Sequence, residues 1–575
     1  MATHDLVIRG GTIFDGTGGE PFVADVGING ARITAIGQEV QAGVEEIDAR
    51  GKIVTPGFVD VHTHYDGQVT WEHRLSPSSG HGVTTVVMGN CGVGFAPCKV
   101  RDHQLAIKLM EGVEDIPDVV MSTGVPWNWQ TFPEYLDALE RRETDIDFAA
   151  QLPHSPLRVY VMGERGVNLE PPTAQDLAEM RRLTAEAVRA GALGVSTSRS
   201  FAHRFRSGKL APSVPTEDEE VLALAAGLRD AGAGVFQMVP SYDVTATERF
   251  DLFRKIVATS GRPLSFTFMQ TPQHPGDWQQ TLEDLDAAQA EGLPIKGQVI
   301  ARPTGGLLGL ELSLHPFSLN PSFREIEDLP LEAKIASMRD PEFRRRLLAE
   351  QPQDPHKFFK FIVSDLEALF VLGDPPNYHP AQEDSIAARA RRLGVEPKEL
   401  IYDSLLERDG HEILYRPMGN MEGERFETSG RYMVKRDTTI LGLGDGGAHY
   451  SMICDAAYPT HLLTHWVRDA DDGRRIPLPL AIRKLANEPA QAVGLCDRGV
   501  LKLGHKADVN VIDLERLRLY APHVQYDLPA AGRRLAQRAD GYTATVVSGQ
   551  VTYRDGVATD ALPGRLVRGA RSRPH

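Results

Sequence analysis

The chain has 575 residues, of which 41% are hydrophobic and 24% charged, a composition that excludes a disordered or fibrous protein. Its formal net charge of −16 argues against nucleic acids and anionic membranes as partners, because both attract basic surfaces. The four cysteines are too few and too scattered for a disulfide framework. The sequence shows no signal peptide and no run of 18 apolar residues, so we predict a soluble, cytoplasmic protein.

Both ends of the chain consist of short β-rich runs separated by glycine turns. Near the start, an Asn-Gly pair at 29–30 stands between two such runs and predicts a hairpin. Near the end, residues 507–513 and 544–553 have the same character. We therefore expect residues 1–55 and 499–575 to form one small sheet domain built from both termini.

In the middle of the chain, helical patterns alternate with short apolar runs. Thr173 predicts the N-cap of a helix that ends at Gly191, Thr216 and Glu219 predict a capping box, and Asp277 predicts a third cap. The apolar runs predict eight parallel strands, at 57–61, 84–88, 147–151, 193–195, 234–239, 264–268, 295–300 and 439–443. Eight βα units favour a barrel, at 56–302 and 438–498, with its active site at the carboxyl ends of the strands.

Residues 303–437 form a long insertion between the seventh and eighth predicted strands. Loops of two to six residues are usual at such places, and longer ones on this face commonly cover a binding site. We interpret the insertion as a lid over the active site, with a peripheral structural role or a dimer contact as the alternatives.

Two segments carry residues suited to metal-assisted hydrolysis. His62 and His64 end an apolar run, and because residues two apart in a strand point to the same face, both imidazoles project together. Paired imidazoles suit a cation such as zinc. Asp445 ends the eighth predicted strand, where a carboxylate can accept a proton from water and pass it to a leaving amine. The alternative for Asp445 is an ordinary turn residue.

Several motifs resemble the amidohydrolase superfamily, and in particular its N-acyl-D-amino-acid deacylase (D-aminoacylase) branch. The segments that carry this resemblance are 56–64 (PGFVDVHTH), 82–92 (GVTTVVMGNCG), 154–158 (HSPLR), 191–197 (GALGVST), 499–501 (GVL) and 507–508 (AD). The resemblance implies an α/β fold, a distorted (β/α)8 TIM barrel with a small β-sandwich formed from both termini, and zinc-dependent hydrolysis of an amide. Carried over by motif, His62, His64 and Cys91 would be metal ligands, and Asp445 the catalytic acid/base that also touches the metal.

The resemblance breaks at the fifth and sixth predicted strands, where the family has two further metal-binding histidines. Gln237 stands in the fifth strand, and the run 264–270 contains no histidine and lacks the lysine that holds the substrate carboxylate in the family. We therefore expect one Zn²⁺ ion rather than two. For Cys91, the alternative to a metal ligand is a small buried hydrophobic side chain.

Other polar residues are weaker candidates for the site. Arg199 and Arg302 follow predicted strands and could bind a substrate carboxylate, and His449 could line the pocket; their alternative is a structural ion pair. His461 and His465 stand four apart on a predicted helix, but the glutamate of the zinc-protease motif is missing, which favours a core or surface role.

We interpret the chain as a metal-dependent hydrolase of a small-molecule amide, most similar to the N-acyl-D-amino-acid deacylases. Two alternatives remain open: a hydrolase of cyclic amides, imides or lactones, and a metal-deficient barrel that acts as a binding protein. The convergence of His62, His64 and Asp445 argues against the last, because polar groups held together without a ligand are costly. Whether the chain forms a homo-oligomer is left open.

Overall fold

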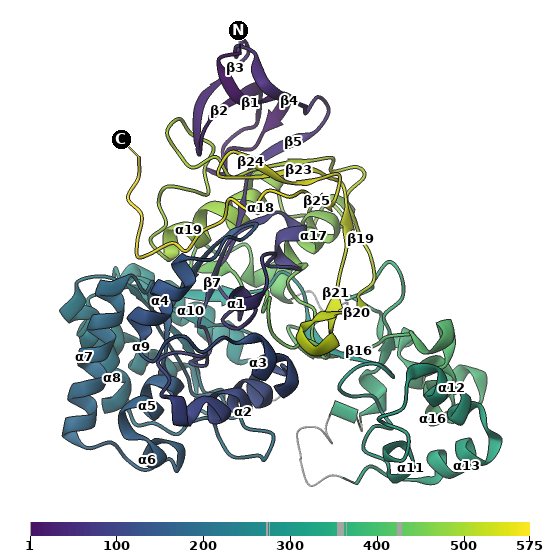
Figure 1. Ribbon diagram of the computed structural model, residues 1–575. Helices are drawn as coiled ribbons and strands as arrows, with labels where there is room; N and C mark the ends of the chain where they lie inside the picture. Colours follow the sequence, from purple (N-terminus) through teal and green to yellow (C-terminus); the bar gives the residue numbers. More distant parts are fainter. Residues whose placement is uncertain are drawn as a thin grey trace.

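The computed structural model describes residues 2–271, 274, 276–353, 362–363, 365–421 and 428–574. Its centre is an α/β arrangement of parallel strands with helices packed outside them (Figure 1). One parallel sheet has the order β6-β7-β8 and a second the order β9-β10-β11-β12-β13-β17. Their bounds are Phe58–Asp60 (β6), Val83–Met88 (β7), Asp147–Ala150 (β8), Leu152–Pro153 (β9), Gly194–Ser198 (β10), Val235–Val239 (β11), Leu264–Thr267 (β12), Ile295–Val299 (β13) and Thr439–Leu441 (β17).

All eight predicted strand positions carry parallel strands, and the α/β class is confirmed. The strands are buried almost throughout, and most of their residues are apolar or small, as in VTTVVM of β7 and VFQMV of β11. Among the described residues, no ladder joins β17 back to β6, so the ladders do not close a barrel. The loops after these two strands are nevertheless tied together, because the Asp445 N–H donates to the His62 carbonyl and the His64 N–H donates to the Gly446 carbonyl.

Amphipathic helices follow most of the strands and bury their apolar faces against them. Their bounds are His103–Glu114 (α2), Asp118–Gly124 (α3), Phe132–Glu140 (α4), His154–Met162 (α5), Ala174–Ala190 (α7), Asp218–Ala231 (α8), Ala246–Ser260 (α9) and Asp277–Ala290 (α10). Phe250 and Phe253 of α9 pack on Phe266 of β12, with ring centroids 5.8 and 4.6 Å from its own. No helix in the described ranges is both long and apolar enough to cross a bilayer.

The predicted helix caps were right in one case and wrong in two. Thr173 and Asp176 form a capping box on α7, and Gly191 ends the helix in the left-handed region. The Thr216 prediction was wrong: Glu217 is the N-cap of α8, and the Thr216 hydroxyl instead donates to the Ser213 carbonyl. The Asp277 prediction was wrong too, because this residue is the first residue of α10 and its carboxylate accepts a hydrogen bond from Arg249.

A nine-stranded sheet joins the two ends of the chain, with β5 of the N-terminal part paired to β18 of the C-terminal part. The predicted hairpin at residues 29–30 connects β2 to β3. The strands are His4–Ile13 (β1), Phe22–Asn29 (β2), Arg32–Gly37 (β3), Gly43–Asp48 (β4), Ile53–Pro56 (β5), Val509–Ile512 (β18), Tyr542–Val547 (β23), Gln550–Arg554 (β24) and Val557–Ala558 (β25). The domain boundaries drawn from the sequence stay predictions.

The segment between β13 and β17 contains its own three-stranded sheet, in which β16 lies between β14 and β15, and its own apolar cluster. Its helices lie to one side of the parallel sheets (Figure 1, lower right). The elements are Thr304–Leu308 (β14), Pro321–Arg324 (α11), Leu331–Arg339 (α12), Pro341–Ala349 (α13), Phe370–Val371 (β15), Ile386–Leu393 (α15), Pro397–Leu405 (α16) and Leu414–Gly419 (β16). After β17 come Tyr458–His461 (α17), Leu462–Asp469 (η8), Leu478–Ile482 (α18), Arg483–Asn487 (η9) and Glu488–Ala492 (α19).

One buried histidine ties three parts of the chain together and makes stability depend on pH. His81 Nε2–H donates to the Gln537 carbonyl at 3.1 Å, and its Nδ1 lies 2.8 Å from Thr460 Oγ1, whose hydroxyl is therefore the donor. Burial lowers the pKa of His81 to about 4. The folded chain thus keeps this side chain neutral at a pH where the unfolded chain binds a proton.

We expect His81 to reduce the free energy of unfolding as the pH falls from about 6.5 to about 4, by up to about 3 kcal/mol, and to have no such effect above that window. Urea unfolding at about pH 7 and pH 5 measures this loss, which should be smaller in a His81→Gln variant than in the wild type. The exposed His411 provides a control, His411→Gln, that should keep the wild-type loss. An equal loss in the wild type and His81→Gln would contradict the prediction.

Candidate metal and catalytic site

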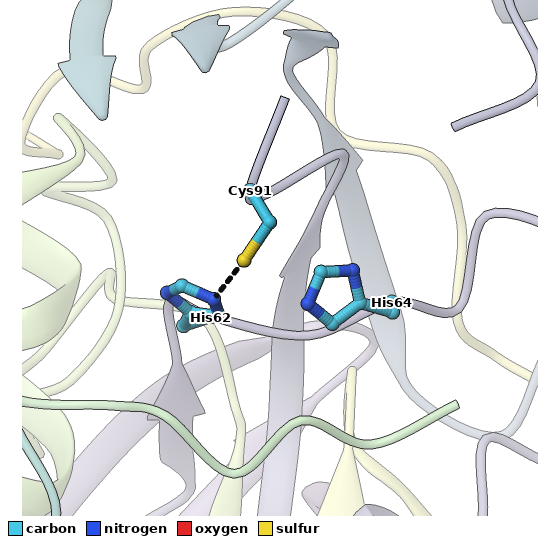
Figure 2. A group of neighbouring side chains, drawn as sticks. All are labelled: His62, His64 and Cys91. Atoms are coloured by element: carbon cyan, nitrogen blue, oxygen red, sulfur yellow. Dashed lines mark hydrogen bonds between the residues drawn. The ribbon is translucent and has the colours of Figure 1, made fainter. Parts of the chain in front are cut away.

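His62 and His64 leave the carboxyl end of β6 and lie buried inside the parallel sheets. Their ring centroids are 5.5 Å apart at an interplanar angle of 67°, so the rings meet edge to face rather than stacking. Figure 2 shows Cys91, which follows β7, above the two rings, with its Sγ 3.2 Å from His62 Nε2. One ligand atom from each of the three residues lies within 4.8 Å of the other two. The predicted His-x-His pair and Cys91 therefore meet at one place.

Asp445 enters the same place from the loop after β17. Its Oδ1 is 3.6 Å from His62 Nε2 and 3.7 Å from His64 Nε2. The loop can approach so closely because of its glycines: a Cβ on Gly444 would lie 2.1 Å from Asp60 Oδ2. Cys91 (φ 57°) and Asp445 (φ 49°) both hold left-handed backbone conformations, which are costly for non-glycine residues and typical of functional sites.

A neighbouring amide fixes which nitrogen of His62 faces the site. His62 Nδ1 lies 2.7 Å from Gln298 Oε1, and an amide oxygen only accepts, so Nδ1 carries the hydrogen. The Gln298 amide is held in turn by its Nε2, which donates to Ser265 Oγ at 2.9 Å. The lone pair of His62 is thereby left on Nε2, which points toward Cys91 and Asp445. This is the arrangement that metal-binding histidines usually have.

A buried carboxylate, Glu114 at the end of α2, stands behind the second histidine. Its Oε1 is 3.4 Å from His64 Nδ1, and neither atom has a hydrogen bond within the described part of the chain. Its Oε2 is 3.5 Å from Nε2 of His449, whose backbone N–H donates to the Glu114 carbonyl. Glu114 thus lies beside His64 and, through its backbone carbonyl, holds the predicted pocket residue His449 near the site.

The charges at this site suit a cation. Burial, together with nearby Asp445 and Asp66, raises the pKa of Glu114 well above its usual range, and burial also raises the pKa of Asp445. The imidazoles stay neutral, since burial lowers the pKa of His62 to about 4. Neutral imidazoles, a thiol, the buried Glu114 and the partly exposed Asp445 have no Lys or Arg ion pair within the described ranges, and they form a donor set that fits a divalent metal ion, which would stabilise the ionised acids.

The two arginines singled out in the sequence have different environments. Arg199 follows β10 and its Nη1 donates to Asp218 at 2.9 Å, while its Nε and Nη2 have no hydrogen bond among the described residues. Arg302 follows β13, is buried, forms an ion pair with Asp455 and lies 3.8 Å above the Tyr378 ring. A role in substrate binding stays a prediction for both, and each already has an ion pair, Arg199 with Asp218 and Arg302 with Asp455.

Sequence reasoning missed several residues of the site. Gln298 lies in a predicted strand, and the alternation of side chains along that strand could have indicated that it faces the site. Glu114 lies on a helix and His203 in a loop, and no motif marks either of them. Burial, with His449 and His62 nearby, lowers the pKa of His203 to about 3. Gln237, which stands where the family has a histidine, is buried, and neither atom of its amide has a hydrogen bond among the described residues.

Comparison with known proteins identifies the family. The amidohydrolase family matches residues 45–553. The chain belongs to the amidohydrolase family. This amidohydrolase is 28% identical to the N-acyl-D-glutamate deacylase of Alcaligenes xylosoxydans xylosoxydans, over 98% of the chain and 96% of that protein, and equally to an uncharacterized protein of Mycobacterium tuberculosis over the same shares. The D-aminoacylase of the same Alcaligenes is 35% identical over 34% of the chain.

The fold of this amidohydrolase also matches solved structures. The match to a D-aminoacylase crystal structure covers 98% of this chain and 100% of that one, with a TM-score of 0.64 at 23% identity. The same shares, at 22% identity and a TM-score of 0.64, hold for the N-acyl-D-glutamate deacylase of Bordetella bronchiseptica, which was solved with zinc and a phosphonate inhibitor. The resemblance to the D-aminoacylase branch is confirmed, and the chain is a hydrolase of carbon–nitrogen bonds, of the deacylase type.

Proposed function

We propose that this amidohydrolase is a zinc-dependent deacylase of N-acyl-D-amino acids. The observation that carries the proposal is the convergence of four atoms of ligand type: His62 Nε2, His64 Nε2, Cys91 Sγ and Asp445 Oδ1. The family's further histidines are absent, so we infer one ion at this centre. We also propose that the eight predicted strands form a barrel around the site, although the hydrogen-bonded ladders between them do not close it.

In the proposed reaction, water and an amide give a carboxylate and an amine. A zinc ion held by His62, His64 and Cys91 would act as a Lewis acid toward the scissile carbonyl. Asp445 accepts a proton from the water as the C–O bond forms, and then delivers this proton to the departing nitrogen as the C–N bond breaks. Its side chain is 22% exposed, whereas those of the two histidines are only 1–2% exposed, so Asp445 alone of the three can face a substrate.

The substrate carboxylate needs a cation, because the lysine of the family is missing. We propose Arg199, which lies at the carboxyl end of β10 and has two nitrogen atoms with no hydrogen bond among the described residues. His449, beside Glu114, is proposed to line the pocket on the other side of the site.

The test is a hydrolysis assay on the zinc-loaded protein with matched D and L substrates. We expect release of free amine from N-acetyl-D-glutamate, N-acetyl-D-aspartate or N-acetyl-D-methionine, at least about tenfold faster than from the L enantiomers. Five-membered cyclic imides and lactones serve as controls and should not open. Ring opening without linear amide hydrolysis would favour the cyclic alternative, and no hydrolysis at full zinc occupancy would favour a binding protein.

We also propose that the insertion, residues 303–437, is a lid that shapes the substrate pocket. The structure suggests a clean deletion, because Leu308 of β14 pairs with Leu414 of β16 in an antiparallel ladder. An Asn-Gly turn can therefore replace residues 309–413. We expect the barrel to stay folded with a lowered thermal midpoint, because the deletion removes Tyr378, which packs on the buried Arg302, while the ratio of kcat/KM between short and long N-acyl substrates changes about tenfold or more.

Light scattering distinguishes the lid from a dimer contact in this deletion variant. A lid predicts an altered substrate profile at an unchanged number of subunits. An unchanged substrate profile, together with a shift from dimer to monomer, would contradict the lid and establish a contact surface.

A further inference from the structure

Gln237 of β11 carries a buried carboxamide that the fold leaves without a partner. Its side-chain oxygen and nitrogen are both shielded from solvent, and neither has a hydrogen bond in the part of the chain that the structure describes. Buried polar groups in proteins are almost always hydrogen-bonded, because leaving one unpaired costs about as much free energy as losing a hydrogen bond. An exception of this kind indicates a group whose partner is a molecule outside the chain.

The alternation of β11 places this carboxamide on the inner face of the parallel sheets. Phe236 and Met238 belong to the large apolar cluster that includes the outer helices, whereas Val235 belongs to a separate cluster with Val59 of β6. Side chains two apart on a strand point to the same face, so Gln237 shares the inner face of Val235 and lies two residues nearer the carboxyl end. It therefore points into the space that holds the catalytic centre.

On the β10 side, Gln237 lies next to the loop that carries Cys91. Its register partner there is Ser196, one strand spacing of about 4.8 Å away. Ser196 Oγ accepts a hydrogen bond from the Gly92 N–H at 3.1 Å and donates its own hydrogen to the Gly89 carbonyl. The hydroxyl of Ser196 is thus committed to the backbone on either side of Cys91, and its hydrogen is not available to Gln237.

On the β12 side, Gln237 lies next to the residues that orient His62. Its register partner Ser265 accepts a hydrogen bond from Gln298, whose amide oxygen accepts the Nδ1 hydrogen of His62. Thr267, two residues further along the inner face of β12, has a buried hydroxyl that likewise lacks a hydrogen bond among the described residues. Three polar atoms without partners, two of Gln237 and one of Thr267, therefore face the space beside the catalytic centre.

A carboxamide without a partner fits a ligand that presents a donor and an acceptor side by side. Its oxygen accepts one hydrogen bond and its nitrogen donates another, as glutamine does to the adjacent N6 and N7 of adenine. In an extended N-acyl amino acid, the amide N–H and one carboxylate oxygen lie on the same side of the molecule. The N–H and C=O of the trans amide itself point in opposite directions, so one carboxamide cannot bind both.

We propose that Gln237 binds the substrate by two groups at once: its Oε1 accepts a hydrogen bond from the scissile N–H, and its Nε2 donates one to a carboxylate oxygen. The inference rests on the proposed deacylase function and deepens it, and the second carboxylate oxygen stays available for Arg199. As Asp445 protonates the departing nitrogen, the hydrogen bond to Oε1 becomes charge-assisted and therefore stronger in the transition state. Gln237 thereby selects amides of amino acids over the corresponding esters.

Kinetics with a matched pair of substrates test the contact to the N–H. The zinc-loaded wild type and Gln237→Leu are compared on the best N-acetyl-D-amino acid and on the O-acetyl-D-hydroxy acid that has oxygen in place of its N–H. We expect Gln237→Leu to lower kcat/KM about 100-fold for the amide and about tenfold at most for the ester. Gln537→Leu, the same change at a buried position in the C-terminal part of the chain, should leave the ratio of amide to ester unchanged. Equal losses on the two substrates, or no loss on the amide, would overturn the proposal.

Folding of the variants distinguishes a carboxamide that binds substrate from one with a structural role. Leucine removes an unpaired polar group from the interior, so circular dichroism should show that Gln237→Leu folds without substrate. If it does not fold, Gln237→Met, which keeps the unbranched shape, takes its place in the same comparison. Failure of both variants to fold would assign the carboxamide a structural role and overturn the proposal.

Binding measurements separate this inference from the proposed function. If the wild type hydrolyses neither substrate, the deacylase function fails, and calorimetric titration of the zinc-loaded protein with N-acetyl-D-aspartate and O-acetyl-D-malate decides the role of Gln237. Affinity for the amide that falls at least about tenfold more than affinity for the ester in Gln237→Leu supports the contact. Equal changes for the two compounds, or no binding of the amide by the wild type, overturn it.

Discussion

Replacing Asp445 with asparagine should reduce kcat by at least about 100-fold while the protein stays folded. Asparagine has nearly the same shape as aspartate but accepts no proton at neutral pH, so it removes the proposed transfer from water to the leaving nitrogen. The loss should appear in kcat and kcat/KM together, because the proton moves in the transition state. Steady-state kinetics on the best D substrate, with circular dichroism as the folding check, measures the effect.

The same variant separates two roles of Asp445, which lies 3.6 Å from His62 Nε2 and 3.7 Å from His64 Nε2. Zinc content that stays at the wild-type value assigns the loss to proton transfer, whereas a parallel loss of zinc shows that the carboxylate is also a ligand. Asp560→Asn, the same change at an exposed position, should leave both quantities unchanged. Turnover of Asp445→Asn within a few-fold of the wild type would rule out the proton-transfer role.

Loss of the metal should reduce hydrolysis by a similar factor. Substituting a residue that contacts the ion should reduce it more than substituting a residue that contacts only a ligand. We expect His62→Asn to abolish tight zinc binding at the catalytic centre and with it hydrolysis, because His62 Nε2 is one of the converging ligand atoms. Gln298→Leu removes only the partner of His62 Nδ1, and partners of this kind are worth about 10–100-fold in metal affinity or activity.

Zinc affinity measured by competition with a chelator, followed by activity at saturating zinc, tests this order. Gln237→Leu is the matched control, since Gln237 is a buried glutamine of β11, which β12 separates from β13, and its amide has no hydrogen bond among the described residues. Its zinc affinity should equal that of the wild type. Equal affinities for Gln298→Leu and Gln237→Leu would show that the hydrogen bond to His62 does not support the ion.

Prediction from a local motif fails where another local hydrogen bond competes with the one that the motif predicts. Thr216 and Glu219 have the spacing of a capping box, but the Thr216 hydroxyl donates to the Ser213 carbonyl, and the helix begins two residues later. Thr173 has no such competitor, and its capping box forms as expected. A cap is worth only about 1 kcal/mol, so a single alternative hydrogen bond is enough to move the start of a helix.

The sequence by itself determined the α/β class, the eight strand positions and the grouping of His62 with His64. These follow from periodicity within a few residues: a buried parallel strand is a continuous apolar run, and residues two apart on a strand face the same way. Asp445 followed from its place at the end of the eighth predicted strand, and the resemblance to amidohydrolases added Cys91, which no spacing rule could have brought to the same place.

Only the tertiary structure decided the surroundings of those residues. Gln298 lies 236 positions after His62, yet it contacts this imidazole because the carboxyl ends of parallel strands meet at one end of the sheets. Glu114 lies 50 positions after His64 and comes within 3.4 Å of it because the end of α2 packs beside the site. His379 meets His461 across 82 positions for a related reason, since the insertion packs on the helical segment after β17. Such contacts depend on the packing of whole elements, which local periodicity does not encode.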